Sequence, residues 1–325
     1  MSLMLLRRVV PASLVAVLAL GGCAAFQSGD AATATSSTPE ASDDARTTVL
    51  ASFYPLLYLA SEIGGDRVEV ESLTPPGVDP HTVELSPRTV TDIEGADLVA
   101  YLSGFQPAVD EAVAVTGATA FDAGEHTRLL TTGETGHDHD HEGHADHDHS
   151  GEFLDPHFWL DPARLAEVAA ALAEELTAVD PDGAATYEAN AERVVAELTD
   201  LDAEIDAGLA RCAQDTIVVT HEAYGYLTSE HGIRQEGLSG IDPEAEPSPA
   251  RLAEVADVVD EHGVDTVFVE SLVSPAVSEA LASDLGLRTE VLDPLENQQD
   301  PDLDYPAVMR ANLAALQDAL GCEAP

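Results

Sequence analysis

The sequence contains no lysine, and its 13 basic residues, all arginine, stand against 61 acidic ones over 325 residues. The formal net charge of −48 makes nucleic acid and anionic membrane surfaces poor partners, because both carry charge of the same sign. The same field attracts cations, but it also suits a surface that only keeps the protein soluble in salty surroundings. The charge therefore argues against a nucleic-acid partner, but it does not show whether the protein binds a cation.

Three motifs of common catalytic sites are also missing. The chain has no HExxH, GxSxG or CxxC pattern. No candidate general base stands out either, so we do not expect an enzyme. A zinc hydrolase remains an alternative, because three histidines with one open coordination position also make up a hydrolytic zinc centre.

Long hydrophobic runs are scarce, and the one near the N-terminus, residues 9–20, is too short for a comfortable membrane span. Arg7 and Arg8 precede it and small residues follow, which predicts a signal peptide over residues 1–22. Leu20-Gly21-Gly22-Cys23 resembles the lipobox of bacterial lipoproteins, which implies cleavage before Cys23 and a lipid anchor on it. The alternative is a plain secretory signal. Residues 23–46 are small, polar and unpatterned, as expected of a flexible tether.

Cysteine is rare, and after Cys23 only Cys212 and Cys322 remain. Thiols oxidise outside the cytoplasm, so we expect these two to form a disulfide that ties the last helix to the start of the second lobe. Two independent buried thiols are the alternative.

From residue 47 onward, short β-rich runs alternate with helical patterns, which is typical of parallel α/β units. Four such runs precede a long helical pattern over residues 181–211, which would extend roughly 40 Å, and four follow it. The predicted fold is therefore two similar α/β lobes with parallel sheets, residues 47–180 and 212–325, joined by one long rigid helix. Loops at the carboxyl ends of the strands should meet at a metal cleft between the lobes.

Four residues should face this cleft, and each lies in a segment whose backbone is restrained by a proline or by the end of a strand. His81 is in "GVDPHTVELSP", His157 in "DPHFWLDP", His221 in "IVVTHEAYGYL" and Asp293 in "TEVLDPLE". A single loop histidine is usually a packing or surface residue, but four such positions together are harder to dismiss. Three imidazoles and one carboxylate suit a four-coordinate Zn²⁺ better than manganese, which prefers more oxygen.

A second cluster of histidines lies in the acidic segment 134–151, where nothing is apolar enough to pack and fix a geometry. We expect it to be an auxiliary metal loop that collects zinc loosely rather than the principal site. Its six histidines are His137, His139, His141, His144, His147 and His149.

These motifs, together with "GLSGIDPEAEPSP" and "FVESLVSP", resemble the cluster A-I metal-binding lipoproteins, the solute-binding components of zinc and manganese ABC importers. The resemblance covers residues 47–322. It implies two α/β lobes joined by a rigid helix, with His81, His157, His221 and the strand-end carboxylate Asp293 as metal ligands. Glu270 or water is the reserve for the fourth position.

The resemblance also implies a function. Manganese-selective members often have glutamate where this chain has His221, so histidine there favours zinc, as does the histidine-rich loop. We expect an extracytoplasmic, lipid-anchored monomer that captures Zn(II) and delivers it to an importer permease with its ATPase. A manganese-binding member of the family and a metal-dependent adhesin are the alternatives.

Overall fold

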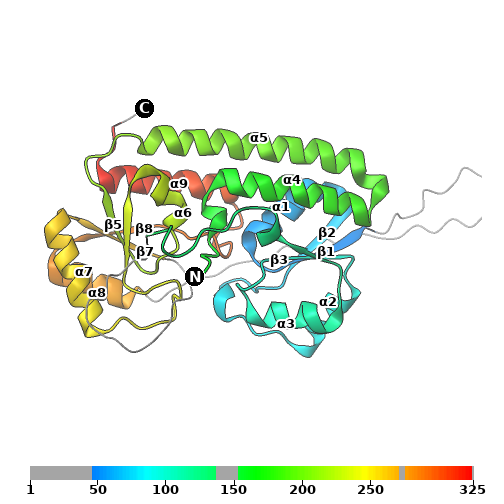
Figure 1. Ribbon diagram of the computed structural model, residues 1–325, viewed down its shortest axis with the longest axis horizontal. Helices are drawn as coiled ribbons and strands as arrows, with labels where there is room; N and C mark the ends of the chain where they lie inside the picture. The colour runs from blue at the N-terminus through cyan, green and yellow to red at the C-terminus, as the bar shows by residue number, and fades with distance from the viewer. Residues whose placement is uncertain (1–45, 137–152, 271–274, 324–325) are drawn as a thin grey trace, which may run out of the picture. The chain divides into compact units, whose positions relative to one another are not determined.

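A computed structural model describes residues 46–136, 153–270 and 275–323 (Figure 1). These described residues group into one compact unit. The predicted signal peptide, Cys23, nearly all of the tether and the six histidines of the auxiliary loop lie outside the described residues.

The first half of the fold is a four-stranded parallel sheet in the order β2-β1-β3-β4. Alternate side chains of the central strand β1 enter different cores. Val49 and Ala51 join the large core that also contains α1, whereas Leu50 joins a smaller core with α2 and α3. Burial on both faces is typical of a parallel strand. The elements are β1 (Thr47–Ala51), α1 (Tyr54–Gly64), β2 (Val68–Ser72), α2 (Pro87–Gly95), β3 (Leu98–Tyr101), α3 (Pro107–Thr116) and β4 (Ala120–Asp122).

The second half repeats this arrangement, with parallel strands in the order β6-β5-β7-β8. Both sheets thus place their strands in the relative order second, first, third, fourth, which confirms the predicted pair of similar parallel α/β units. The elements are β5 (Thr216–Val219), α6 (Gly225–Thr228), β6 (Arg234–Gly237), α7 (Pro249–His262), β7 (Thr266–Val269), α8 (Ala276–Leu285), β8 (Arg288–Val291) and α9 (Tyr305–Leu320).

Two helices connect the halves along the sequence, and the longer one packs against elements of both. In α4 (Pro162–Val179) the predicted apolar stripe of Leu165, Val168 and Leu172 is fully buried. The long helix α5 (Ala184–Leu209) follows a 3₁₀ turn at Pro181–Gly183 and packs against α1 of the first half, against α4 and against α9 of the second half (Figure 1). At 1.5 Å per residue its 26 residues extend about 39 Å. The predicted lobe boundaries themselves stay predictions.

One predicted helix is much shorter than expected. The pattern "EAYGYLTSEHG" indicated a helix directly after His221, but α6 has only four residues and begins at Gly225. The preceding backbone N–H groups have other partners: that of Glu222 donates to the carbonyl of Gly240, and that of Tyr224 to the side chain of Gln235. These bonds tie residues 222–224 to distant parts of the chain, and the helix begins only after them.

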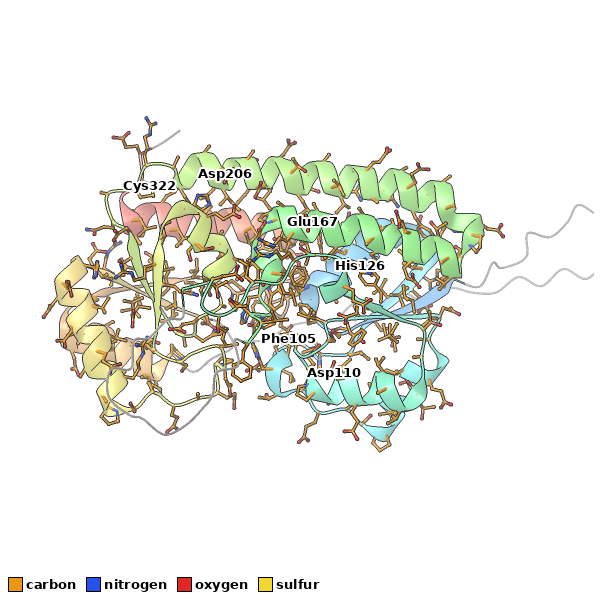
Figure 2. The ribbon with its side chains drawn as sticks, in the orientation of Figure 1. Phe105, Asp110, His126, Glu167, Asp206 and Cys322 are labelled. Carbon is orange, nitrogen blue, oxygen red and sulfur yellow. A yellow bond between two sulfur atoms is a disulfide. The ribbon has the colours of Figure 1, made fainter. Side chains whose placement is uncertain are left out.

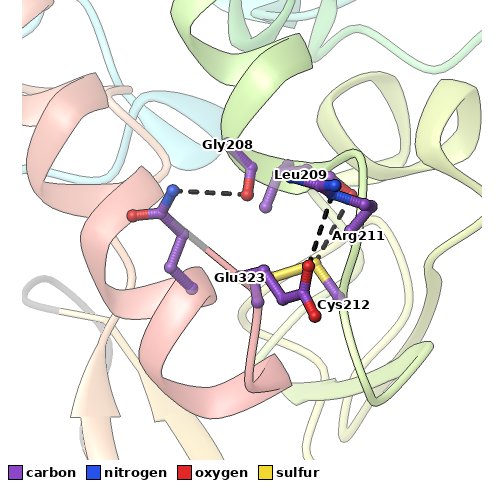
Figure 3. The surroundings of a disulfide bond; sticks show 7 residues. Gly208, Leu209, Arg211, Cys212 and Glu323 are labelled. Atoms are coloured by element: carbon purple, nitrogen blue, oxygen red, sulfur yellow. Dashed lines mark hydrogen bonds and ion pairs between the residues drawn. A yellow bond between two sulfur atoms is a disulfide. The ribbon is translucent and has the colours of Figure 1, made fainter. Parts of the chain in front are cut away.

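The predicted disulfide between Cys212 and Cys322 is present (Figure 3). It joins the chain just after α5 to the chain just after α9, across 110 residues of sequence. Beside it, the backbone N–H of Glu323 donates to the carbonyl of Arg211, at 2.9 Å. The bond therefore fixes the last helix to the end of the long helix.

Within the described residues, no helix combines the length and apolarity needed to cross a membrane.

Candidate metal centre

His81 is held in a short turn between β2 and α2. The carboxylate of Asp79 accepts the backbone N–H of His81 at 2.8 Å and thereby caps the 3₁₀ turn Pro80–Thr82. The His81 ring meets the ring of Phe105 edge-on, with centroids 4.7 Å apart (Figure 2 labels Phe105). The proline and the aromatic contact restrict both the backbone and the ring.

His157 lies at the start of a second short turn and is completely buried. Its backbone N–H and its ring Nδ1 both lie within hydrogen-bond distance of one oxygen of Asp155, at 2.9 and 2.8 Å. Because a carboxylate can only accept, Nδ1 carries a proton, and Nε2 is the nitrogen that can bind a metal. The Trp159 ring packs against the His157 ring at 5.2 Å and limits access of water.

His221 follows β5 and is also completely buried. Glu270 follows the neighbouring strand β7, and its carboxylate lies 2.8 Å from Nδ1 of His221. The order β6-β5-β7-β8 makes the β5–β7 boundary the switch point of this sheet, which is where ligands bind in open α/β folds. As with His157, the Nδ1 contact directs Nε2 toward the centre.

Glu296 completes the group from the segment between β8 and α9. One of its carboxylate oxygens lies 3.1 Å from Nε2 of His81, 3.2 Å from Nε2 of His157 and 3.3 Å from Nε2 of His221. The four ligand atoms lie within 4.8 Å of one another. In a tetrahedral zinc site with bonds of about 2.0 to 2.2 Å, neighbouring ligand atoms are about 3.3 to 3.6 Å apart. The spacing therefore fits one ion among these residues.

The fourth residue of the group differs from the sequence prediction, which was Asp293, with Glu270 or water as the alternative. Neither residue belongs to the group of four. One oxygen of Asp293 accepts the backbone N–H of Leu295 at 2.7 Å, and Glu270 contacts the outer nitrogen of His221. The carboxylate that faces the three histidines is three residues further along the chain than the one predicted.

The charges of the centre are strongly coupled. Burial lowers the pKa of His157 and of His221, but the neighbouring carboxylates outweigh it, so the pKa of His157 is raised and that of His221 is raised well above its usual value. Burial opposes ionisation of Glu296, yet the three histidines hold its pKa well below the usual range. The centre thus keeps an ionised carboxylate among imidazoles that share protons with their partners.

One residue that the sequence analysis missed had a visible signal. Asp79-Pro80-His81 and Asp155-Pro156-His157 are the same tripeptide, and in both the aspartate accepts the backbone N–H of the histidine. The repeat marks Asp155 as part of the centre. Glu296 has no comparable signal, because "PLENQQ" resembles an ordinary polar loop.

The sequence matches the family described as "ZnuA: Zinc-uptake complex component A periplasmic" over residues 49–319. It is 32% identical to the zinc-binding lipoprotein AdcA of Streptococcus pneumoniae strain R6 over 293 residues, which cover 87% of this chain and 57% of AdcA. It is also 32% identical to the high-affinity zinc uptake system protein ZnuA of Bacillus subtilis, with 84% of this chain and 87% of that protein covered. The chain thus spans little more than half of AdcA but most of ZnuA.

Solved structures agree with the sequence matches. The Zn(II)-bound ZnuA-like domain of S. pneumoniae AdcA aligns with a TM-score of 0.70 at 30% identity, covering 85% of this chain and 99% of that one. The laminin-binding protein Lmb of Streptococcus agalactiae aligns with a TM-score of 0.74 at 30% identity, covering 84% and 99%. Sequence, fold and the grouping of three histidines with one carboxylate all agree, and the chain belongs to the ZnuA family of zinc-uptake complex components.

Proposed function

We propose that the protein is a solute-binding protein that captures Zn²⁺ and delivers it to an ABC-type zinc importer. The observation that carries the proposal is the buried group of His81, His157, His221 and Glu296, whose ligand atoms converge on one point. The names of AdcA and ZnuA support the choice of metal. The ion is cargo: the centre binds it, and the partner's ATP hydrolysis drives its import.

The donor set favours zinc over manganese. Three neutral imidazole nitrogens and one carboxylate oxygen suit tetrahedral Zn²⁺, whereas manganese prefers a larger share of oxygen ligands. Asp155 and Glu270 add to the preference, because a carboxylate on Nδ1 makes Nε2 a stronger nitrogen donor. A manganese-selective centre would have more carboxylates facing the ion.

A binding protein accounts for the centre better than a zinc hydrolase does. A hydrolytic zinc ion needs an open position for the water that it activates. Here Glu296 lies opposite the three histidines and would occupy the fourth position, and His157 and His221 are completely buried. Capture and release are therefore the chemistry that this arrangement supports.

The proposed setting is the outer face of a membrane, with residues 1–22 as a signal peptide and a lipid on Cys23. Residues 23–46 would be a tether, and the monomer would present its centre to a permease that works with an ATPase. The description of the relative AdcA as a lipoprotein supports this placement. The auxiliary loop, residues 134–151, would collect zinc before it reaches the buried centre.

Adhesion is the second candidate. Lmb of S. agalactiae is described as a bifunctional protein with adhesin and metal-transporting activity, and its fold covers 84% of this chain. Binding of the purified full chain to immobilised laminin, with and without zinc, tests this role separately from zinc uptake.

Titration calorimetry of the full chain tests the metal proposal. We expect one tight zinc site and much weaker manganese binding. Replacing His81, His157, His221 or Glu296 with alanine should each lower zinc affinity by more than about a hundredfold, since the loss of an outer partner alone is worth about 10- to 100-fold.

His126→Ala is the matched control. His126 is exposed, stacks on Phe121 and lies outside the group of four, so its loss should leave the tight site unchanged. Wild-type affinity in any of the four centre variants would contradict the assignment of that residue.

A further inference from the structure

The segment that carries Glu296 contains an unusual backbone conformation. Leu295 has a φ of 57°, and among the described residues it is the one non-glycine residue with positive φ. This left-handed conformation is disfavoured for a residue with a bulky side chain, so it persists only where surrounding contacts enforce it. Leu295 directly precedes Glu296, and its side chain is buried.

A local turn holds Leu295 in place. The Asp293 carboxylate accepts the backbone N–H of Leu295 at 2.7 Å, two residues on, which is the pattern of an Asx turn. Asp293 is itself fixed by Asn312 of α9, whose side-chain oxygen accepts its N–H at 2.9 Å and whose side-chain nitrogen donates to its carbonyl at 2.7 Å. Asn312 is 2% exposed, so water does not compete for these bonds.

Two further hydrogen bonds anchor the backbone at the start of the turn. The Tyr224 hydroxyl donates to the carbonyl of Leu292, and the Trp159 indole donates to the carbonyl of Pro294, both at 2.7 Å. Tyr224 belongs to the second half and Trp159 to the chain between the sheets. The turn therefore starts from a fixed position.

The backbone after the turn is anchored as well. The backbone N–H of Tyr54 donates to the carbonyl of Glu296 at 3.3 Å. The Asn297 side chain donates to the carbonyls of Pro75 and Val78 at 3.0 and 2.9 Å. With both ends fixed, the conformation of Leu295 decides where the Glu296 side chain points.

We propose that Asp293 is a positioning residue for the metal centre: its turn keeps Leu295 left-handed and thereby presents Glu296 to the three histidines. The inference rests on the proposed zinc function. In this role Asp293 acts on the centre without binding the ion. The part of Asp293 that acts is its side-chain oxygen as a hydrogen-bond acceptor, and its negative charge is not required.

Three variants of the full chain separate this role from direct binding. Asp293→Ala removes the acceptor and should lower zinc affinity about 10- to 100-fold, the range for an outer partner. Asp293→Asn keeps an acceptor oxygen and should stay within about threefold of wild type. In Asp293→Ala combined with Leu295→Gly, glycine adopts positive φ without a side-chain clash, so most of the affinity should return. Leu295→Gly alone is the control for added backbone freedom.

Affinity is measured by competition with a zinc chelator, and hydrogen exchange of residues 292–297 is followed in the metal-free protein. Exchange there should be faster in Asp293→Ala than in Asp293→Asn. The inference is overturned if the asparagine variant loses as much affinity as the alanine variant, if glycine fails to restore it, or if both variants exchange alike. If wild type takes up no zinc, the proposed function fails, and the exchange experiment still decides whether Asp293 holds the turn.

Discussion

At the scale of single residues, both ring nitrogens of the two buried histidines, His157 and His221, have a specific partner. Asp155 and Glu270 each accept a hydrogen bond from Nδ1–H of a buried histidine, and Nε2 of the same ring points to Glu296. A bound ion would replace the contacts of Nε2 and leave those of Nδ1 intact. The metal-free and metal-bound centres therefore differ mainly in protons held between imidazoles and Glu296.

Zinc binding should for this reason release protons and weaken in acid. Because the pKa of His157 and of His221 lies above 6.5 in the folded metal-free protein, their protonated forms stabilise that state fully below 6.5 and lose this effect as pH rises through the raised values. Zinc needs the deprotonated rings, so its affinity has the opposite dependence. We expect proton release on zinc binding at pH 7, and a zinc-induced rise in Tm that shrinks as pH falls.

Calorimetry in buffers of different ionisation enthalpy measures the released protons. Glu270→Gln is the matched variant, because it removes a carboxylate that raises the pKa of His221 but leaves an acceptor for Nδ1. It should release fewer protons at pH 7 than wild type does. Equal release in both proteins would show that Glu270 does not set the protonation of His221.

At the scale of elements, one arginine connects α7 to the strands beside the centre. The Arg251 guanidinium donates to the carbonyl of Gly237 at 2.7 Å and lies 2.7 Å from Glu236 and 3.4 Å from Glu222. Both glutamates are largely buried. Glu222 directly follows His221, so this arginine fixes the backbone that carries a candidate ligand.

Arg251→Met should destabilise the fold by about 3 kcal/mol, because removing one partner of a buried ion pair leaves charge that is poorly compensated. Denaturant unfolding of the metal-free protein measures the change. Arg288→Met is the control: Arg288 also contacts two carboxylates, Asp265 and Asp318, but its side chain is 48% exposed. Exposed pairs contribute about 0 to 1 kcal/mol. A similar loss of unfolding free energy in both variants would contradict the claim that burial makes the Arg251 contacts more stabilising than those of Arg288.

The same elements show what the sequence could predict. Strands and long helices have local signals, namely β-rich runs and a period of 3.6 residues, and the eight strands in the described part of the chain were all expected. The predicted helix directly after His221 was wrong, and the backbone N–H groups of Glu222 and Tyr224 donate instead to Gly240 and Gln235, which are distant in sequence. Local patterns contain no information about such partners.

At the scale of the whole molecule, the centre combines segments from both halves of the fold. The three histidines could be predicted because a proline directly precedes His81 and His157 and a strand end precedes His221. The fourth residue could not, because the choice between Asp293 and Glu296 depends on a turn fixed by Asn312, Trp159 and Tyr54. These contacts join residues up to 242 positions apart, the separation of Tyr54 and Glu296 (296 − 54). Only the folded chain decides which carboxylate faces inward.

The buried centre and the auxiliary loop should also be separable in the whole molecule. The chain on either side of the loop is joined by an antiparallel β-bridge between Thr131 and Leu154. Asp155, which accepts the hydrogen bond from Nδ1 of His157, directly follows this bridge. Replacing residues 137–150 with a Gly/Ser segment of equal length should therefore keep the ends in place. We expect the variant to lose weak, excess zinc in calorimetry while one tight site survives, because none of the four centre residues is removed. Loss of the tight site would instead make the loop the principal ligand, and unchanged stoichiometry would show that the loop collects no zinc.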